Sequence, residues 1–461
     1  MIIDTTLLSR IQFGFTVGFH ILFPTLNIGL AVFLSIMEGM WLKTTNTIYL
    51  KICQFWTKIF ALTFGMGVVS GIVLAYELGT NFGPFIHTAG GVIGALFVYE
   101  VLAAFFLEAG FLGVMLFGWN KVSPKLHYSA TLLVTLGTIF SALGIMSANS
   151  WMQTPAGFHI EAGQYVVDSW WNVIFNPSMA PRFLHMLLAS LVTSFFVVAG
   201  VSAWYLQKQR HVIIAKKCFS VALLGAVILT PTQIFLGDLV GLKIHEYQPL
   251  KTAAIEGNWK TQKGAPFVIF AIPDSKEAKN HYELSIPKFA SLINTHHWDG
   301  TLLGLDSVSP KNRPVVGATF WMFRIMLAIG FLFLLVALIA LYLYLRERLY
   351  TYRGFYRLCV AIAPLGFLST IAGWITAESG RQPWVVYGLI RTADGASVVP
   401  LHQVVISLAL LVVVYGIIFT FYLFYLFKVI RKGPDDTPLS NETTADMIIE
   451  TPFKYMAPEV K

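Results

Sequence analysis

Nine long apolar stretches constrain this chain of 461 residues more than any other feature. About 20 apolar residues are enough to cross the roughly 30 Å hydrocarbon core of a membrane as a helix. Such stretches begin near Ile11, Cys53, Gly91, His127, Arg182, Lys216, Ala318, Arg357 and Leu401. With 56% hydrophobic and 12% charged residues, the chain is far more apolar than a soluble domain. The sequence therefore predicts an all-α, polytopic membrane protein with nine transmembrane helices in bundles.

Lysine and arginine are distributed unevenly over the connections between these stretches. They collect after the first, third, fifth, seventh and ninth stretches, at Lys43, Lys51, Lys121, Lys125, Lys208, Arg210, Lys216, Lys217, Arg346, Arg348, Arg353, Arg357, Lys428, Arg431 and Lys432. Because basic loops are retained in the cytoplasm, we expect the N-terminus outside and the C-terminus inside. This topology explains the net charge of +8, and no nucleic-acid partner is expected.

The polar segments divide the chain into four parts. We expect transmembrane helices 1–6 in residues 1–240, an outer loop in 241–317, transmembrane helices 7–9 in 318–430 and a cytoplasmic tail in 431–461. The first apolar stretch is too long for a cleavable signal peptide and has no basic region before it. Between the fourth and fifth stretches, Trp151, Trp170 and Trp171 are expected in the interfacial aromatic belt.

Two glutamates in the third stretch are candidates for proton transfer, because ionisable groups in hydrocarbon are costly and usually functional. Glu100 and Glu108 are eight residues apart, so a regular helix separates them by about 12 Å along its axis and about 80° around it. They can be successive stations of a proton path, but not a hydrogen-bonded pair.

His20, in the first stretch, also needs a partner, either a neighbouring helix or an iron.

A histidine and a methionine lie at similar depth on two other stretches. His185 is about one turn inside the outer end of the fifth stretch, and Met326 lies in the outer third of the seventh. Methionine alone is typical of core packing. Together, however, His and Met are an axial pair that holds a six-coordinate, electron-transferring haem. Arg324 needs an anionic partner, and a haem propionate would be a suitable one.

The eighth stretch ends in a dense polar cluster, residues 378–384, ESGRQPW. Glu378 and Arg381 would share a face of a continuing helix. Gly380 and Pro383 instead favour a helix that stops here. A carboxylate in this place can be a solvated cap, but the concentration of polar groups favours a functional site.

The outer loop contains one segment with helical spacing, HEYQPLKTAAIEGNWKTQ, in which Gln248, Lys251 and Glu256 stand among apolar residues. An ordinary solvated amphipathic helix is one interpretation of this pattern. His296 and His297 are adjacent in the same loop, and we expect them on the surface rather than as metal ligands.

Taken together, the chain resembles subunit I of the cytochrome bd-type quinol oxidases. The segments that carry the resemblance are LSRIQFGFTVGFH, EVLAAFFLE, KTAAIE, FRIM and GRQPW, in order and at consistent membrane depth. The resemblance covers nearly the whole chain. It implies nine helices in the bacterial cytoplasmic (inner) membrane, a periplasmic Q-loop of the short form, quinol oxidation outside and reduction of O2 to water. Such an enzyme generates a proton motive force without pumping.

The resemblance also implies cofactors, partners and residue roles. It implies two b-type haems plus haem d, or a third haem b as in the cyanide-insensitive branch. Residues expected near haem are His20, His185, Arg324, Met326, Trp374, Glu378 and Arg381; those expected to carry protons or bind quinol are Glu100, Glu108, Gln248, Lys251 and Glu256. Expected partners are subunit II, a small single-span accessory subunit, ubiquinol or menaquinol, and O2.

Within this set, four residues would bind iron. His185 and Met326 would be the axial ligands of the low-spin haem b. His20 and Glu378 would bind the two high-spin haems, and which of them holds the oxygen-reducing iron stays open.

Other classes of membrane protein predict different patterns. A haem-free secondary transporter would show inverted repeats and paired broken helices. Another membrane b-type cytochrome would carry paired histidines about four turns apart on two helices, and a haem-copper oxidase a cluster of intramembrane histidines. The membrane histidines here are single.

Replacing Met326 with leucine tests the haem assignment. Leucine has a similar volume but no thioether to bind iron, so the fold should persist while the low-spin haem b signal is lost from the reduced-minus-oxidised spectrum. Met322→Leu, one turn earlier in the same stretch, is the control. An unchanged spectrum in Met326→Leu would show that Met326 is not a ligand.

Overall fold

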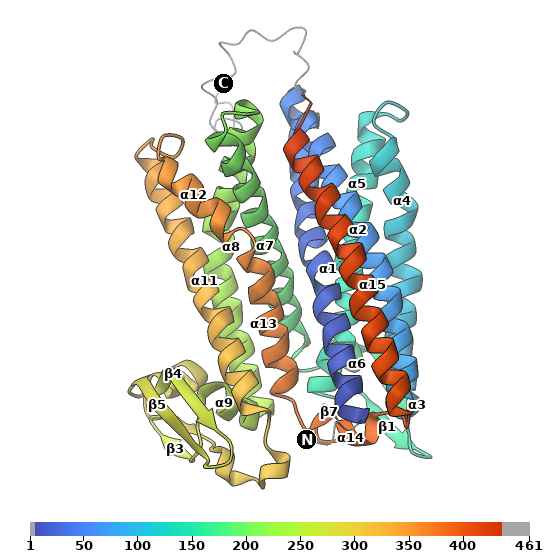
Figure 1. Cartoon of the computed structure of the whole chain (residues 1–461), viewed down its shortest axis with the longest axis vertical. Helices are drawn as coiled ribbons and strands as arrows, with labels where there is room; N and C mark the ends of the chain where they lie inside the picture. The colour runs from blue at the N-terminus through green and yellow to red at the C-terminus, as the bar shows by residue number, and fades with distance from the viewer. Residues whose placement is uncertain (1–4, 436–461) are drawn as a thin grey trace.

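The computed structural model describes residues 5–435 as a tall bundle of helices with a small soluble region at one end (Figure 1). Within these residues, nine helical segments are long and apolar enough to cross a membrane: Thr5–Thr44, Thr47–Asn81, Gly83–Phe117, Pro124–Gln153, Met179–Gln207, Val212–Tyr247, Pro310–Leu345, Arg353–Ser379 and Leu401–Lys432. This confirms the predicted all-α polytopic fold. The predicted tail falls mostly beyond residue 435, outside the described residues.

Seven of the spans contain one long helix each: α1 (Thr5–Thr44), α2 (Thr47–Asn81), α5 (Pro124–Gln153), α7 (Met179–Gln207), α8 (Val212–Tyr247), α11 (Val316–Leu345) and α15 (Leu401–Lys432). The third span is composite: α3 (Gly83–Tyr99), a π-helical segment η1 (Glu100–Phe105) and α4 (Phe106–Phe117). The eighth is broken between α12 (Arg353–Ile362) and α13 (Leu365–Ser379). Pro364 stands at that break, where it lacks the N–H that a continuous helix would need.

The spans form two groups (Figure 1). Helices α7, α8, α11 and α13 pack against one another, and α2, α4 and α5 lie on the other side of α1. Helix α1 contacts both groups, and its apolar window is among the most buried, whereas α15 lies at the periphery and is mostly exposed. The apolar core therefore runs along α1 and α7.

The connections at the end of the bundle that holds the start of α1 contain all the described short strands (Figure 1). Two-stranded antiparallel pairs join β1 (Phe158–Glu161) to β2 (Gln164–Val167), β3 (Gln262–Lys263) to β6 (Thr301–Leu302), β4 (Phe267–Asp274) to β5 (Lys279–Ile286), and β7 (Trp384–Val386) to β8 (Ile390–Arg391). Short helices complete this end: α6 (Trp170–Ile174), α9 (Pro249–Glu256), α10 (Phe289–Thr295) and α14 (Thr392–Gly395). Two 3-10 turns, Leu305–Ser307 and Pro310–Asn312, precede α11.

The structure differs from the sequence expectations in three places. Helix α8 continues to Tyr247, so the outer loop begins later than residue 241. Helix α9 is buried from Lys251 to Glu256, which excludes the interpretation as a solvated helix. Trp151 is completely buried and its indole donates to the carbonyl of Ala156 at 3.0 Å, so it does not belong to an interfacial belt.

Glycine allows α1 and α7 to pack closely. At Gly29, a Cβ atom would lie 2.6 Å from the carbonyl oxygen of Ser190, which is too close for any side chain. Nearby, the hydroxyl of Ser194 donates to the carbonyl of Leu26 at 2.9 Å. This contact joins the two groups of helices.

Gly29→Ala should therefore destabilise the protein by about 1–3 kcal/mol, because the added methyl group must push α1 and α7 apart. Thermal unfolding in detergent measures this effect. Gly14→Ala is the matched control on the same helix, since no atom lies within 4 Å of its Cβ position. Equal stability of the two variants would contradict the proposed close contact.

Candidate functional site

The end of α13 holds a buried network around one carboxylate. Oε1 of Glu378 accepts hydrogen bonds from Asn149 Nδ2 at 3.0 Å and Gln153 Nε2 at 3.4 Å. Oε2 of Glu378 forms an ion pair with Arg381. The guanidinium of Arg182 donates to Asn149. Three helices, α5, α7 and α13, thus meet at the polar cluster that the sequence predicts.

Helix α9 joins this network through Gln153. Lys251 Nζ donates to Gln153 Oε1 at 2.5 Å, and Gln248 Nε2 donates to the carbonyl oxygen of Gln153 at 2.6 Å. Lys251 is only 1% exposed, although it belongs to the loop. The two sites that the sequence predicts separately, one in the outer loop and one at the end of α13, are therefore a single site.

Positive charge is in excess at this site, where Arg182, Lys251 and Arg381 share the carboxylate of Glu378. Burial lowers the pKa of Lys251 well below its usual range, and the charge of Arg182 lowers it further. Burial also lowers the pKa of Arg381, against the attraction of Glu378. Among the described residues, nothing accepts from Nε and Nη1 of Arg381 or from Nε of Arg182. Buried donors without acceptors fit an anionic ligand, such as a haem propionate.

Glu256 is the last residue of α9, and one of its carboxyl oxygens has no hydrogen-bond partner among the described residues. Its Oε1 accepts from Asn294 Nδ2 at 2.8 Å, and its buried Oε2 has no partner within the described part of the chain. Burial raises the pKa of Glu256, and the charge of Arg324 opposes this shift. A buried carboxyl group with a raised pKa is a candidate for proton exchange with a bound substrate.

Arg324 holds the loop against α11. Its Nε donates to the carbonyl of Val268 at 2.8 Å, and its Nη1 to the carbonyl of Ile255 at 2.6 Å. The loop backbone and the nearby Glu256 thus supply negative partners for this cation. Its contact with a haem propionate remains a prediction.

Three other candidate iron ligands each face a glycine of a neighbouring helix. A Cβ atom on the glycine would lie about 3 Å from the ligand side chain in each pair: 3.1 Å for Gly71 and Cε1 of His20, 3.2 Å for Gly237 and Cε1 of His185, and 2.9 Å for Gly373 and the sulfur of Met326. Larger residues at these positions would collide with the ligands. The glycines therefore let the neighbouring helix backbones pack directly against the side chains of His20, His185 and Met326.

The ring nitrogens of the two histidines differ in their hydrogen bonds. His20 Nδ1 lies 2.9 Å from the hydroxyl of Ser70, which itself donates to the carbonyl of Met66 at 2.8 Å. The hydroxyl therefore accepts from Nδ1, which leaves Nε2 of His20 unprotonated and able to bind iron. Nδ1 of His185 is buried and has no partner among residues 5–435, while its Nε2 lies 3.3 Å from Gln233 Nε2. Both residues fit a haem iron; Glu378 would have to exchange one of its present bonds.

Glu100 and Glu108 both face α5. The hydroxyl of Ser141 donates to Glu100 at 2.7 Å, and a Cβ atom at Gly137 would lie 3.0 Å from Cβ of Glu108. The π-helical segment η1 begins at Glu100, so the 80° angle expected from a regular helix does not apply. Single π-helical turns are frequent at functional sites.

Several residues of this site escape sequence analysis. Asn149 and Gln153 are four residues apart at the end of an apolar helix, a polar face that could have been noticed. Arg182 stands near the start of α7 and Gln233 lies inside α8, so both could have been noticed in the sequence as polar residues of apolar spans. Ser70 carries no signal, because hydroxyl groups are common in membrane helices. Trp374 lies one turn before Glu378 and is partly buried, and its place near a haem stays a prediction.

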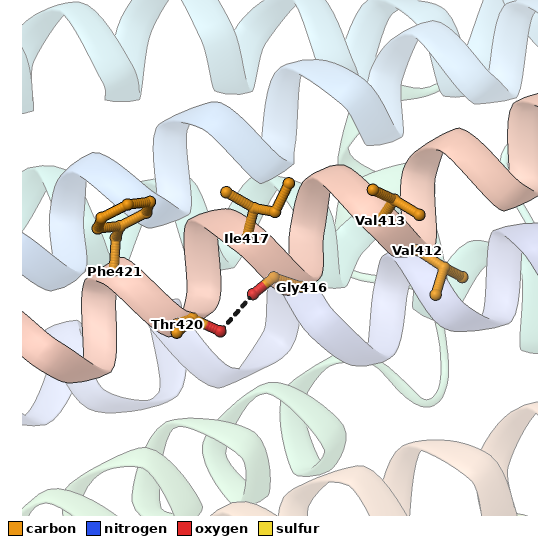
Figure 2. A pocket seen from close by; sticks show the side chains of 6 residues that line it. All are labelled: Val412, Val413, Gly416, Ile417, Thr420 and Phe421. Atoms are coloured by element: carbon orange, nitrogen blue, oxygen red, sulfur yellow. Dashed lines mark hydrogen bonds between the residues drawn. The ribbon is translucent and has the colours of Figure 1, made fainter.

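A shallow groove on α15 lies apart from these groups (Figure 2). The hydrogen bond drawn there, from the hydroxyl of Thr420 to the carbonyl of Gly416, belongs to the helix itself. The groove is lined by Val412, Val413, Gly416, Ile417, Thr420 and Phe421. No ionisable side chain lines it, so this surface suits lipid or another apolar helix rather than a reaction.

Comparisons with known proteins show the family of the chain. The family model for cytochrome bd terminal oxidase subunit I matches residues 8–434. The chain is 34% identical over 451 residues to the cytochrome bd ubiquinol oxidase subunit 1 of Bacillus subtilis (strain 168), covering 94% of this chain and 96% of that protein. It is 31% identical over 499 residues to the cytochrome bd-II ubiquinol oxidase subunit 1 of Escherichia coli (strain K12), covering 94% and 97%.

A solved structure is similar as well. The fold matches a chain of the bd oxidase from Geobacillus thermodenitrificans with a TM-score of 0.88 and 31% identity, covering 94% of this chain and 99% of that one. Sequence and fold thus agree, and the chain belongs to the family of cytochrome bd terminal oxidase subunit I.

Proposed function

We propose that this respiratory quinol oxidase subunit oxidises quinol beside α9, on the periplasmic side of the bacterial inner membrane. The observation that carries the proposal is Gln153, which bonds both Lys251 of α9 and Glu378 of α13. A quinol bound at α9 would therefore lie next to the proposed haem ligand. The substrate is ubiquinol or menaquinol, and both relatives described above are named ubiquinol oxidases.

The proposed roles at α9 follow from proton balance. Oxidation of quinol releases two protons with two electrons. The free Oε2 of Glu256 can accept one of these protons, and Nζ of Lys251 can donate a hydrogen bond to the quinone oxygen. Because α9 lies at the predicted outer end, these protons leave to the outside.

The residues proposed to hold haem fit that group in three respects. Glycines allow close packing around His20, His185 and Met326, the histidines have suitable nitrogens, and the N–H groups of Arg182 and Arg381 that lack acceptors can bind propionates. We assign His185 and Met326 to a low-spin haem b, and His20 and Glu378 to two high-spin haems. One of the latter is a b haem, and the other is haem d or a third haem b. When bound, haem carries electrons from quinol to O2 and binds the oxygen.

Protons for oxygen reduction are proposed to come from the inner side through Glu108 and then Glu100. Both face α5, whose outer end bonds Glu378 through Asn149. If electrons enter from outside and protons from inside, turnover moves charge across the membrane without a pump. Subunit II and a small single-span accessory subunit would complete the enzyme.

Glu256→Gln tests the quinol site. An amide cannot accept the proton, so quinol oxidation should fall by about a hundredfold or more, with unchanged haem spectra. In the unmodified enzyme, the rate should fall as the pH drops through the raised pKa of Glu256, because the protonated carboxyl group cannot act as a base. That acid limb should vanish in the variant. Glu277→Gln, on the exposed surface of the loop, is the control; a normal rate in Glu256→Gln would exclude the site.

Glu108→Gln tests the proton path. The variant should keep its haems but lose oxidase turnover and membrane potential in proteoliposomes, since an amide has no transferable proton. Both quantities are measured with the complete oxidase, by oxygen uptake and a potential-sensitive dye. Full turnover with full potential would place the path elsewhere.

A further inference from the structure

A buried carboxyl–imidazole pair lies near the end of the bundle opposite α9, and the proposed function does not use it. Oε1 of Glu38, on α1, lies 2.6 Å from Nδ1 of His127, on α5. The hydroxyl of Thr131 donates to the other oxygen of Glu38, also at 2.6 Å. Glu38 and His127 are each only 1% exposed. Burial of such a pair is costly, which argues for a specific role.

The hydrogen bonds show that this pair shares a proton. His127 Nε2 lies 3.2 Å from the carbonyl oxygen of Met115, so Nε2 carries a hydrogen and donates it. Nδ1 and the carboxyl group then hold one proton between them, either as neutral imidazole with a carboxylic acid or as imidazolium with a carboxylate. The ring of Trp119 covers the imidazole, with ring centroids 3.9 Å apart. The two groups are thus joined by one hydrogen bond along which a proton can move between them.

Helix α5 connects this pair with the proposed proton path. Four carboxylates from four other segments contact α5 in sequence: Glu38 at Thr131, Glu108 at Gly137, Glu100 at Ser141 and Glu378 at Asn149. At 1.5 Å per residue, these contact points are separated by about 9, 6 and 12 Å along the helix. Glu38 thus stands next to Glu108 in the series, on the side away from the proposed oxygen site.

Hydroxyl groups occupy the interval between Glu38 and Glu108. The hydroxyls of Ser35 and Thr135 are hydrogen-bonded to each other at 2.8 Å, and both residues are buried. Thr138 lies further along α5 and is also buried. A hydroxyl group donates and accepts, so it can receive a proton on one side and release another on the opposite side.

We propose that Glu38 and His127 form the inner loading station that supplies Glu108 with protons; this proposal rests on the proposed path through Glu108 and Glu100. A proton from the inner aqueous side binds the pair, and Glu38 passes one proton through the hydroxyls to Glu108. The pair is then reprotonated from the same side. The number of protons delivered matches the oxidase reaction. Each electron delivered to oxygen consumes one proton, and one O2 takes up four electrons and four protons to form two water molecules.

The pair is placed to receive protons from that side. Glu38 lies six residues before the end of α1, and His127 three residues after the start of α5. The exposed Lys121 and Lys125 flank the same end. We therefore expect entry near the connection between α4 and α5.

Glu38→Gln in the complete oxidase, reconstituted in proteoliposomes, tests the proposal. Haem content and anaerobic haem reduction by quinol should be unchanged, because neither needs inner protons. Turnover with O2 and proton uptake from the inner compartment should fall by about a hundredfold, as for loss of a proton-transfer group. Glu38→Asp should restore most of the rate, since it keeps a transferable proton. Glu347→Gln, an exposed glutamate at the same end, is the control.

A double variant separates a relay from a structural role. If Glu38 and Glu108 act in series, Glu38→Gln with Glu108→Gln should be no slower than the slower single variant. Additive losses would overturn the proposal. If Glu38→Gln does not assemble, His127→Gln replaces it, because the amide can still bond Glu38 but cannot take up a proton; unchanged turnover there would also overturn it.

The outcomes also separate this inference from the proposed function. Loss of turnover in Glu108→Gln together with full turnover in Glu38→Gln would exclude the loading station but would still support the path through Glu108 and Glu100. Full turnover and potential in Glu108→Gln would exclude the path and, with it, the station.

Discussion

The buried charge at the end of α13 is the constraint on which the rest of the site depends. Three buried basic side chains, Arg182, Lys251 and Arg381, surround one carboxylate, and only part of the hydrogen-bonding capacity of the two arginines is used. Such an arrangement is costly unless anionic groups complete it. The same network holds the loop helix α9 in a buried position, because Lys251 donates a hydrogen bond to Gln153 of α5. The proposed quinol site at α9 and the proposed haem ligand Glu378 therefore share one hydrogen-bond network.

Helix α5 organises the polar interior of the bundle. One face carries His127, Thr131, Ser141, Asn149 and Gln153, while large apolar residues elsewhere on the helix, such as Leu132, Leu136 and Phe140, are exposed. Four carboxylates carried by other segments, Glu38, Glu100, Glu108 and Glu378, contact α5. A proton path needs groups at short intervals in an otherwise apolar medium, and one helix with a polar stripe can supply them across the whole thickness.

Close packing between α1 and α7 keeps this interior aligned. A glycine at position 29 lets the backbones approach, and the hydroxyl of Ser194 bonds the backbone of α1. Small residues and backbone hydrogen bonds commonly join helices in membranes, where lipid is as apolar as the side chains. Membership in the cytochrome bd family rules out the haem-free transporter and the other b-type cytochromes that the sequence pattern alone leaves open.

The sequence by itself determines the nine spans, because hydropathy over about 20 residues is a local property. It also indicates most of the candidate ligands, since an ionisable residue in an apolar stretch is conspicuous. It does not reveal that Gln153 joins α9 to α13, that Glu38 pairs with His127, or that α9 is buried. Those features depend on which helices meet and at what rotation. Only the packing of the whole bundle decides this, because the partners are about 90 to 230 residues apart along the chain.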